Sequence, residues 1–134
     1  MPMIRRQISI AAPPRTVWNA LVSAEALARW LGEVPRLDAR EGGRVDLTPR
    51  GVAPVSGLFH TFRPTAKAEI SFDKKGESPW KGTFLSFLVS RDGRETSLNV
   101  QHDGALFDEP AARAEVDEFW RQALQRLRDG VEAA

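Results

Sequence analysis

The amino-acid sequence predicts an α+β protein in which an antiparallel sheet curves around one long C-terminal helix. Three observations predict this fold class. Alternation of apolar and polar residues, typical of strands, runs from Arg36 to His102. A stripe of apolar residues with helical spacing follows from Ala111 to Val131. Two shorter helical patterns lie between the first predicted strand and the sheet region.

The first predicted elements are one strand and two short helices. Residues 4–10 alternate, with Ile4, Ile8 and Ile10 on one face, and predict a half-buried strand. Pro13-Pro14 ends that strand and can open a helix. The apolar positions of this helix are Val17, Trp18, Leu21 and Val22. Ser23 is suited to cap a second helix over 24–31, which Gly32 is expected to end.

The sheet region is divided by turn residues into several strands. The divisions fall at Gly42-Gly43, Pro49-Arg50-Gly51, Pro64 and Gly76. Residues 91–94 predict a hairpin in which Asp92-Gly93 supplies positive φ angles. After it, Thr96, Leu98, Val100 and His102 share one face, and polar residues share the other. The preceding strand, 83–89, is apolar on both faces, so we expect its outer face to be covered.

The last helix is expected over roughly 111–131, with one apolar stripe facing the sheet. The stripe consists of Val116, Phe119, Trp120, Ala123, Leu124, Leu127 and Val131. Leu98, Val100 and His102 are expected to form the wall that it faces. A helix of this kind predicts a lid over the sheet, beneath which a cavity is either open or filled by side chains.

Composition narrows the function classes. A chain of 134 residues with Lys and Arg totalling 19 against 18 Asp and Glu predicts one domain over 1–134, with net charge +1. Such balance argues against a nucleic-acid partner. The absence of Cys excludes disulfides, thiolate catalysis and Cys-ligated zinc. No apolar run predicts a signal peptide or a membrane span, so a cytoplasmic location is expected.

Several segments together resemble one known superfamily. The opening Ile8–Pro14, followed by Val17-Trp18-Asn19-Ala20-Leu21, resembles the START-like (SRPBCC) superfamily and, more narrowly, the family of activator of Hsp90 ATPase homologues. Further matching segments are Trp30, Asp38–Gly43, Gly57–Pro64 and Thr96–Gly104. The sequence departs from the family at Glu77–Gly82, and it has Phe119-Trp120 where Gly-Trp is common. Both departures concern the shape of a pocket rather than the fold.

The resemblance implies a helix-grip fold of the START/Bet v 1-like kind. Members of this superfamily enclose a cavity between the sheet and the closing helix, and they use it for lipids, polyketides, hormones or other apolar molecules. Other members are co-chaperones that act through their surface, and some are cyclases. These implied functions leave three hypotheses for this chain. It is a binding protein for a small hydrophobic ligand, or a protein-interaction module whose partner is another protein or a second copy of the chain. The third hypothesis is a polyketide cyclase or dehydratase-like enzyme.

The aromatic residues are the main candidates for a ligand site. Four Trp and seven Phe occur without any Tyr, which suits an apolar interior or pocket. A packed core is the alternative interpretation for each of them. His102 is either a hydrogen-bonded core histidine or a polar group that anchors a ligand or acts as general base. The predicted ligand-binding residues are Trp30, Phe59, Phe62, Phe72, Trp80, Phe84, Leu98, Val100, His102, Phe119 and Trp120.

Other kinds of site find little support. The two histidines, His60 and His102, are far apart in sequence and show no metal-ligand spacing. No Gly-x-Ser-x-Gly sequence frames a nucleophile, and Gly42-Gly43 alone does not make a phosphate-binding loop. We therefore predict no catalytic residue, no metal site and no cofactor. The apolar strand 83–89 motivates the interaction hypothesis, and His102 motivates the enzyme hypothesis.

Overall fold

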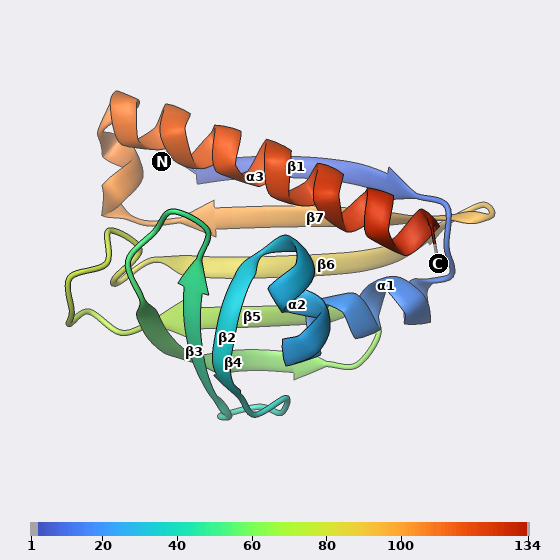
Figure 1. The fold of residues 1–134 in the computed structure, drawn as a ribbon, viewed down its shortest axis with the longest axis horizontal. Coiled ribbons are helices and arrows are strands. Elements are labelled where there is room, and N and C mark those ends of the chain that lie inside the picture. Colours follow the sequence, from blue (N-terminus) through green and yellow to red (C-terminus); the bar gives the residue numbers. More distant parts are fainter. Residues whose placement is uncertain (1–2, 134) are drawn as a thin grey trace.

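The computed structural model describes residues 3–133 and has the predicted helix-grip architecture (Figure 1). Seven antiparallel strands form one sheet in the order β1-β7-β6-β5-β4-β3-β2. The strands are β1 (Met3–Ile10), β2 (Gly32–Leu37), β3 (Arg44–Pro49), β4 (Val55–Arg63), β5 (Lys67–Phe72), β6 (Phe84–Asp92) and β7 (Glu95–Asp103). The helices are α1 (Pro14–Leu21), α2 (Ala24–Trp30), the short 3₁₀ helix η1 (Ala105–Asp108) and α3 (Pro110–Glu132).

The sheet is curved, and the helices lie on its inner face (Figure 1). Figure 1 shows α3 running along β1 and β7, while α1 and α2 lie over the other part of the sheet. β1 pairs with β7, so that Ile4 lies opposite His102 and Ile8 opposite Leu98. This register places the apolar residues of both strands on the face beneath α3. β1, β7 and α3 thereby pack together in the core.

The two short helices start as predicted, but the sheet begins earlier. Pro14 occupies the first turn of α1, and the Ser23 hydroxyl accepts a hydrogen bond from the Ala26 amide at 3.3 Å. Gly32 does not merely end α2, since it opens β2 and lies opposite Pro49. A side chain at Gly32 would overlap the carbonyl oxygen of Thr48. The expected start of the strand region at Arg36 is therefore wrong by four residues, because this glycine lets β2 approach β3 directly.

The β6–β7 hairpin has a different turn from the one expected. Asp92 and Glu95 form the last strand pair, so Gly93 and Arg94 are the two loop residues. Gly93 has φ 63°, whereas Asp92 belongs to β6 and has no positive φ. This is the pattern of a type II′ turn, which needs glycine only at its first central position. The prediction that Asp92 supplies a positive φ is wrong.

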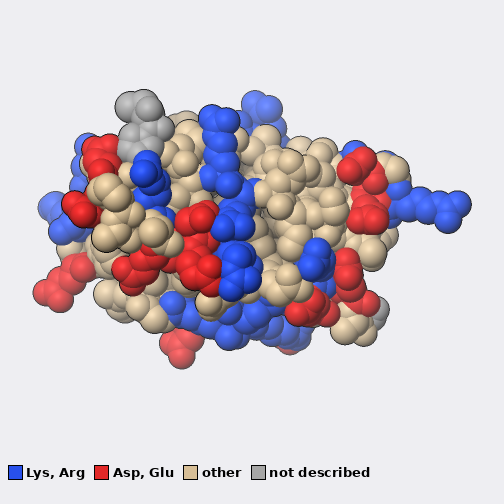
Figure 2. All heavy atoms as spheres, turned by 90° about the horizontal axis from the view of Figure 1, so that it is seen from above, with Lys and Arg blue, Asp and Glu red and all other residues tan. Residues whose placement is uncertain are grey.

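The apolar stripe of α3 is confirmed. Val116, Trp120, Ala123, Leu124 and Leu127 are buried, and Phe119 and Val131 are half-buried against the core. Arg6 and Asp117 form an ion pair with two hydrogen bonds, the shorter at 2.8 Å. This pair joins α3 to the edge strand β1. Figure 2 shows acidic and basic side chains interspersed on the face that carries α3. That face has no large area of a single charge.

Side chains of neighbouring strands cover part of the outer face of β6. Phe84 and Leu88 are half-buried there, and the His60 ring lies 5.7 Å from the Phe84 ring. Ser86 donates a hydrogen bond to Glu69 at 3.1 Å. Apolar surface on this face therefore remains partly accessible. Among residues 3–133, no helix combines the length and the hydropathy that crossing a membrane requires.

Candidate ligand-binding site

Aromatic side chains fill the space beneath the middle of α3. Trp80, His102, Phe107 and Trp120 have no exposed surface, and we call them the aromatic cluster. The rings of Trp80 and Trp120 are stacked with centroids 5.8 Å apart. The His102 ring lies 4.6 Å from Trp80 and 4.9 Å from Phe107. α3, β7, η1 and the β5–β6 connection each contribute one ring, so the cluster joins four parts of the fold.

A chain of hydrogen bonds runs through this cluster. The Trp120 indole Nε1 donates to His102 Nδ1 at 3.1 Å. Because an indole N–H can only donate, Nδ1 is the acceptor and the proton of a neutral imidazole lies on Nε2. His102 Nε2 then donates to Thr83 Oγ1 at 2.9 Å, and Thr83 Oγ1 donates to the Trp80 carbonyl at 2.6 Å. Each N–H and O–H donor in this series of hydrogen bonds has an acceptor.

The surroundings of His102 keep its imidazole neutral. Burial lowers the pKa of His102 from 6.5 to about 3, because a charged ring would lose its hydration. Both ring nitrogens are engaged, so a ligand could reach one only by displacing Trp120 or Thr83. In this arrangement His102 orients the aromatic cluster and is not available as a general base.

The first hollow lies beside the aromatic cluster, along the amino-terminal half of α3; we call it the amino-terminal groove. It has a volume of about 410 Å³, within the usual range for ligand pockets. Its apolar lining residues are Val52, Ala53, Pro79, Trp80, Leu106, Ala112, Val116 and Phe119. Its polar lining residues are Arg50, Glu115, Glu118 and Gln122. Apolar side chains therefore provide most of the surface that a ligand would contact.

Trp80 gives this groove a specific polar feature. Its indole Nε1 is buried and has no hydrogen-bond partner among the residues that the structure describes. A buried donor left without an acceptor costs about 1–3 kcal/mol. An oxygen acceptor on a bound molecule would recover that free energy. The groove thus combines an apolar lining with one unsatisfied donor in a lining residue.

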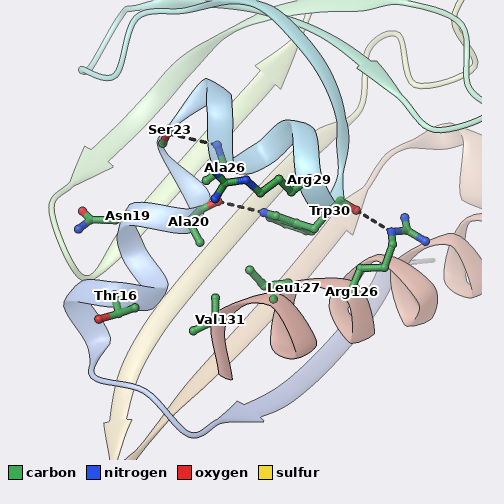
Figure 3. A pocket seen from close by; sticks show the side chains of 11 residues that line it. Thr16, Asn19, Ala20, Ser23, Ala26, Arg29, Trp30, Arg126, Leu127 and Val131 are labelled. Carbon is green, nitrogen blue, oxygen red and sulfur yellow. Dashed lines mark hydrogen bonds between the residues drawn. The ribbon is translucent and has the colours of Figure 1, made fainter. Parts of the chain in front are cut away.

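The second hollow lies at the other end of α3, between its last turns and the two short helices (Figure 3). This carboxy-terminal groove has a volume of about 310 Å³. Its lining residues are Thr16, Asn19, Ala20, Ser23, Ala26, Arg29, Trp30, Arg126, Leu127, Gly130 and Val131. The Trp30 indole donates to the Ala20 carbonyl at 3.0 Å, and Arg126 Nε donates to the Trp30 carbonyl at 3.1 Å. Trp30 is thus held from both sides.

The predicted site residues fall into five places. Trp80 and Phe119 line the amino-terminal groove, and Trp30 lines the carboxy-terminal groove. His102 and Trp120 belong to the aromatic cluster. Within the core, the remaining inward-facing predicted residues are Phe59, Phe62, Phe72, Leu98 and Val100. Phe84 lies on the outer face of the sheet, away from α3, and lines neither groove.

Some residues of these sites were not singled out from the sequence. Phe107 lies in η1, which is too short to show a periodic pattern in the sequence, and its ring is buried. Arg126 lies on the flank of the α3 stripe, where a solvated charge is the usual expectation. The apolar pair Leu106-Phe107 was the one available signal that this segment packs inward. Among residues 3–133, no group of three His, Cys, Asp or Glu side chains is arranged to hold a metal ion.

Comparison with known proteins places the chain among similar folds. The model of the family described as "Activator of Hsp90 ATPase homolog 1-like protein" matches residues 11–132. No curated protein matches the sequence. The solution structure of the Aha1 dimer from Colwellia psychrerythraea has a TM-score of 0.84 at 20% identity, covering 98% of this chain and 97% of that one.

Two further solved structures are similar to this chain. The name of one refers to a biosynthetic locus, and the name of the other states no activity. DynU16, a protein of the dynemicin biosynthetic locus, has a TM-score of 0.80 at 18% identity, covering 98% of this chain and 48% of its own. CalU16 from Micromonospora echinospora has a TM-score of 0.76 at 25% identity, covering 96% of this chain and 75% of its own. These similarities establish the fold of the chain.

Proposed function

Because the chain belongs to the family of activator of Hsp90 ATPase homolog 1-like proteins, we propose that it binds a small, mostly apolar molecule in the amino-terminal groove. This groove lies between α3, η1 and the β3–β4 and β5–β6 connections, beside the space between the sheet and α3 where the sequence predicts a ligand. The observation that carries the proposal is Trp80, which lines the groove and has an unsatisfied buried indole N–H. An apolar lining with few polar groups is the usual design of a small-molecule site.

The chemistry of the groove favours a ligand that carries an oxygen acceptor on an apolar body. The acceptor would receive a hydrogen bond from Trp80 Nε1 once the groove opens toward this ring, which has no exposed surface in this structure, and the body would cover Val116 and Phe119. A fused aromatic ketone meets both requirements.

The test compares two probes that differ only at the acceptor, 2-acetylnaphthalene and 2-ethylnaphthalene. In a ¹⁵N-labelled sample the four Trp indole signals are titrated with each probe, and the Trp80 signal is assigned with Trp80→Phe. We expect the ketone to shift the Trp80 signal and to bind about fivefold more tightly than the hydrocarbon, as one additional hydrogen bond predicts. Equal affinities for the two probes would contradict the proposed hydrogen bond from Trp80 Nε1.

Two half-buried residues of α3 provide matched variants for the same titration. Phe119→Ala removes apolar surface from the amino-terminal groove, and Val131→Ala removes it from the other groove. We expect Phe119→Ala to weaken ketone binding about thirtyfold, since about 2 kcal/mol of apolar contact is lost. Val131→Ala should leave the affinity unchanged. The reverse pattern would contradict the assignment of the ligand to this groove.

A second candidate function is pairing with a second copy of the chain. Leu58, Phe84 and Leu88 lie on the outer face of the sheet, half-buried but not packed against the hydrophobic core. An accessible apolar group of this kind favours a contact surface. The Colwellia structure of the same fold is a dimer, which supports the homodimer over other partners. The cytoplasmic location expected from the sequence stays a prediction.

An enzymatic role through His102 has less support than binding. General acid–base catalysis needs a group that can exchange a proton with a bound molecule near the working pH. His102 is neutral, and both of its nitrogens are hydrogen-bonded inside the protein. We therefore do not assign it a proton-transfer function.

A further inference from the structure

The carboxy-terminal groove has a charge pattern that the proposed function does not use. Its lining contains two arginines, Arg29 and Arg126, and no aspartate or glutamate. The floor between them is apolar, with Trp30, Leu127 and Val131 facing the hollow (Figure 3). A hollow with an apolar floor and an excess of positive charge at its rim matches a ligand that is apolar at one end and anionic at the other.

Arg126 is the distinctive residue of this groove. It is half-buried, and its Nε bond to the Trp30 carbonyl fixes where the guanidinium lies. Among residues 3–133 it forms no ion pair, whereas Arg29 is paired with Glu25 at 3.1 Å. Burial and the positive charge of Arg50 lower the pKa of Arg126. Its charge is therefore partly desolvated and has no counterion within the described chain.

Capping of α2 accounts for only part of this arrangement. Arg126 donates to the carbonyl of Trp30, and Arg50 donates to the carbonyl of Arg29 at 2.8 Å, so two arginines complete the end of the same short helix. Arginine is favoured at a helix C-terminus, but one donor of each guanidinium is enough for this role. The Arg126 bond uses Nε, which leaves the terminal nitrogens of the fork as donors for a second group. Carboxylates are the anions that this fork binds with two parallel bonds.

We propose that the carboxy-terminal groove is a second binding site, for a small apolar carboxylate whose anionic end pairs with Arg126. The apolar end lies over Leu127, Val131 and the ring of Trp30. A volume of about 310 Å³ accommodates one or two rings rather than a long acyl chain. The site is separate from the amino-terminal groove and does not depend on the function proposed for it.

The experiment uses 2-naphthoate and its neutral isostere 2-naphthamide as probes. Each is titrated into the ¹⁵N-labelled full chain while the Trp30 and Trp80 indole signals are followed separately. We expect 2-naphthoate to shift the Trp30 signal and to bind about tenfold more tightly than the amide, since the pair with Arg126 is charge-assisted. A shift confined to Trp80, or equal affinities for acid and amide, would overturn the proposal.

A matched pair of α3 variants isolates the arginine. Arg126→Gln removes the proposed partner, and Arg128→Gln removes a half-buried arginine outside the groove that donates to Gln125. We expect only Arg126→Gln to weaken 2-naphthoate, about tenfold, with 2-naphthamide unaffected in both. Equal losses in the two variants would show a general charge effect and contradict the site. Should Arg126→Gln fail to fold, the acid–amide comparison on the unmodified protein still decides.

Failure here is distinguishable from failure of the proposed function. Binding at the amino-terminal groove is followed through Trp80 and the ketone probe, and binding at this groove through Trp30 and the carboxylate probe. Either signal can respond without the other.

Discussion

His102 shows how one side chain can serve the fold while resembling a functional residue. The alternation of β7 correctly predicted that it faces inward with Leu98 and Val100. Its partners, however, come from elsewhere: Trp120 from α3 and Thr83 from just before β6. Such partners depend on how α3 is rotated on the sheet, which periodicity within one strand does not encode. The sequence therefore predicted the burial of His102 but left its chemistry open.

Burial of His102 makes the stability of the protein depend on pH. The pKa of His102 is about 3 when folded and near 6.5 when unfolded, so the unfolded chain takes up the proton first as the pH falls. This contribution is complete above pH 6.5 and is lost progressively as the pH falls toward 3. We expect the free energy of unfolding to fall by roughly 1.4 kcal/mol for each pH unit in this range. Urea unfolding between pH 4.5 and 7.5 measures the slope.

Two histidine variants separate this effect from other titrations. His102→Gln keeps an acceptor for Trp120 and a donor for Thr83 but does not titrate, so it should remove this part of the slope. His60→Gln changes the exposed histidine of β4 and should leave the slope as it is. A wild-type slope retained in His102→Gln would show that the buried ring is not its source.

At the level of elements, the turn between β2 and β3 shows what two adjacent glycines can do. The sequence predicted a turn at Gly42-Gly43, and the structure gives the two residues different tasks. Gly42 has φ 78° with open space where a Cβ would lie, and Gly43 has no room for a side chain because the Asp38 carbonyl oxygen lies there. Both bind β4, through bonds of 2.8 and 2.9 Å to the backbone of Phe59. Spacing alone could not distinguish a φ requirement from a steric one.

Alanine substitutions should therefore differ at the two positions. Gly42→Ala meets only the cost of a left-handed conformation, about 1 kcal/mol. Gly43→Ala forces the turn away from Asp38 and disturbs its bonds to β4, so we expect a loss of about 3 kcal/mol or more. Equilibrium urea unfolding of both variants checks the difference. Equal losses would contradict the steric account of Gly43.

The length of an element explains which helices and strands were predicted and which were not. Long periodic segments such as β1 and α3 were correct within one or two residues. η1 was missed because four residues are too few to show a period, and the start of β2 was missed because Gly32 was interpreted as a helix end. Both misses concern short segments whose conformation is set by contacts with other parts of the chain.

On the scale of the whole molecule, packing decides where a ligand could lie. The sequence indicated a lid over the sheet, and the structure shows rings of the aromatic cluster filling the middle of the space beneath it. The hollows are displaced to the two ends of α3. Their position depends on the combined volume of residues from α3, η1 and the β5–β6 connection. No single segment of the sequence carries that information, although Trp80 and Phe119 were among the residues singled out.

The proposed homodimer is a prediction at this scale. Light scattering coupled to size exclusion over a concentration series should give twice the chain mass at the highest concentrations and a shift toward the monomer on dilution. Leu88→Lys places a charge on the outer face of β6 and should yield the monomer throughout. Leu37→Lys, a change at another half-buried strand leucine, serves as the control and should still dimerise. A monomer at all concentrations in the wild type would dismiss this candidate.

The pairing of β1 with β7 also determines when the fold can form. β1 is synthesised before the other six described strands, yet its one neighbour in the described sheet is β7, and its ion-pair partner Asp117 lies in α3. During translation, Ile4, Ile8 and Ile10 therefore have no native strand to pair with until β7 has been made. Formation of this sheet edge depends on contacts between distant parts of the sequence, which are the slow kind to form. β1 is thus made before the rest of the sheet and is among the last of its strands to reach its native surroundings.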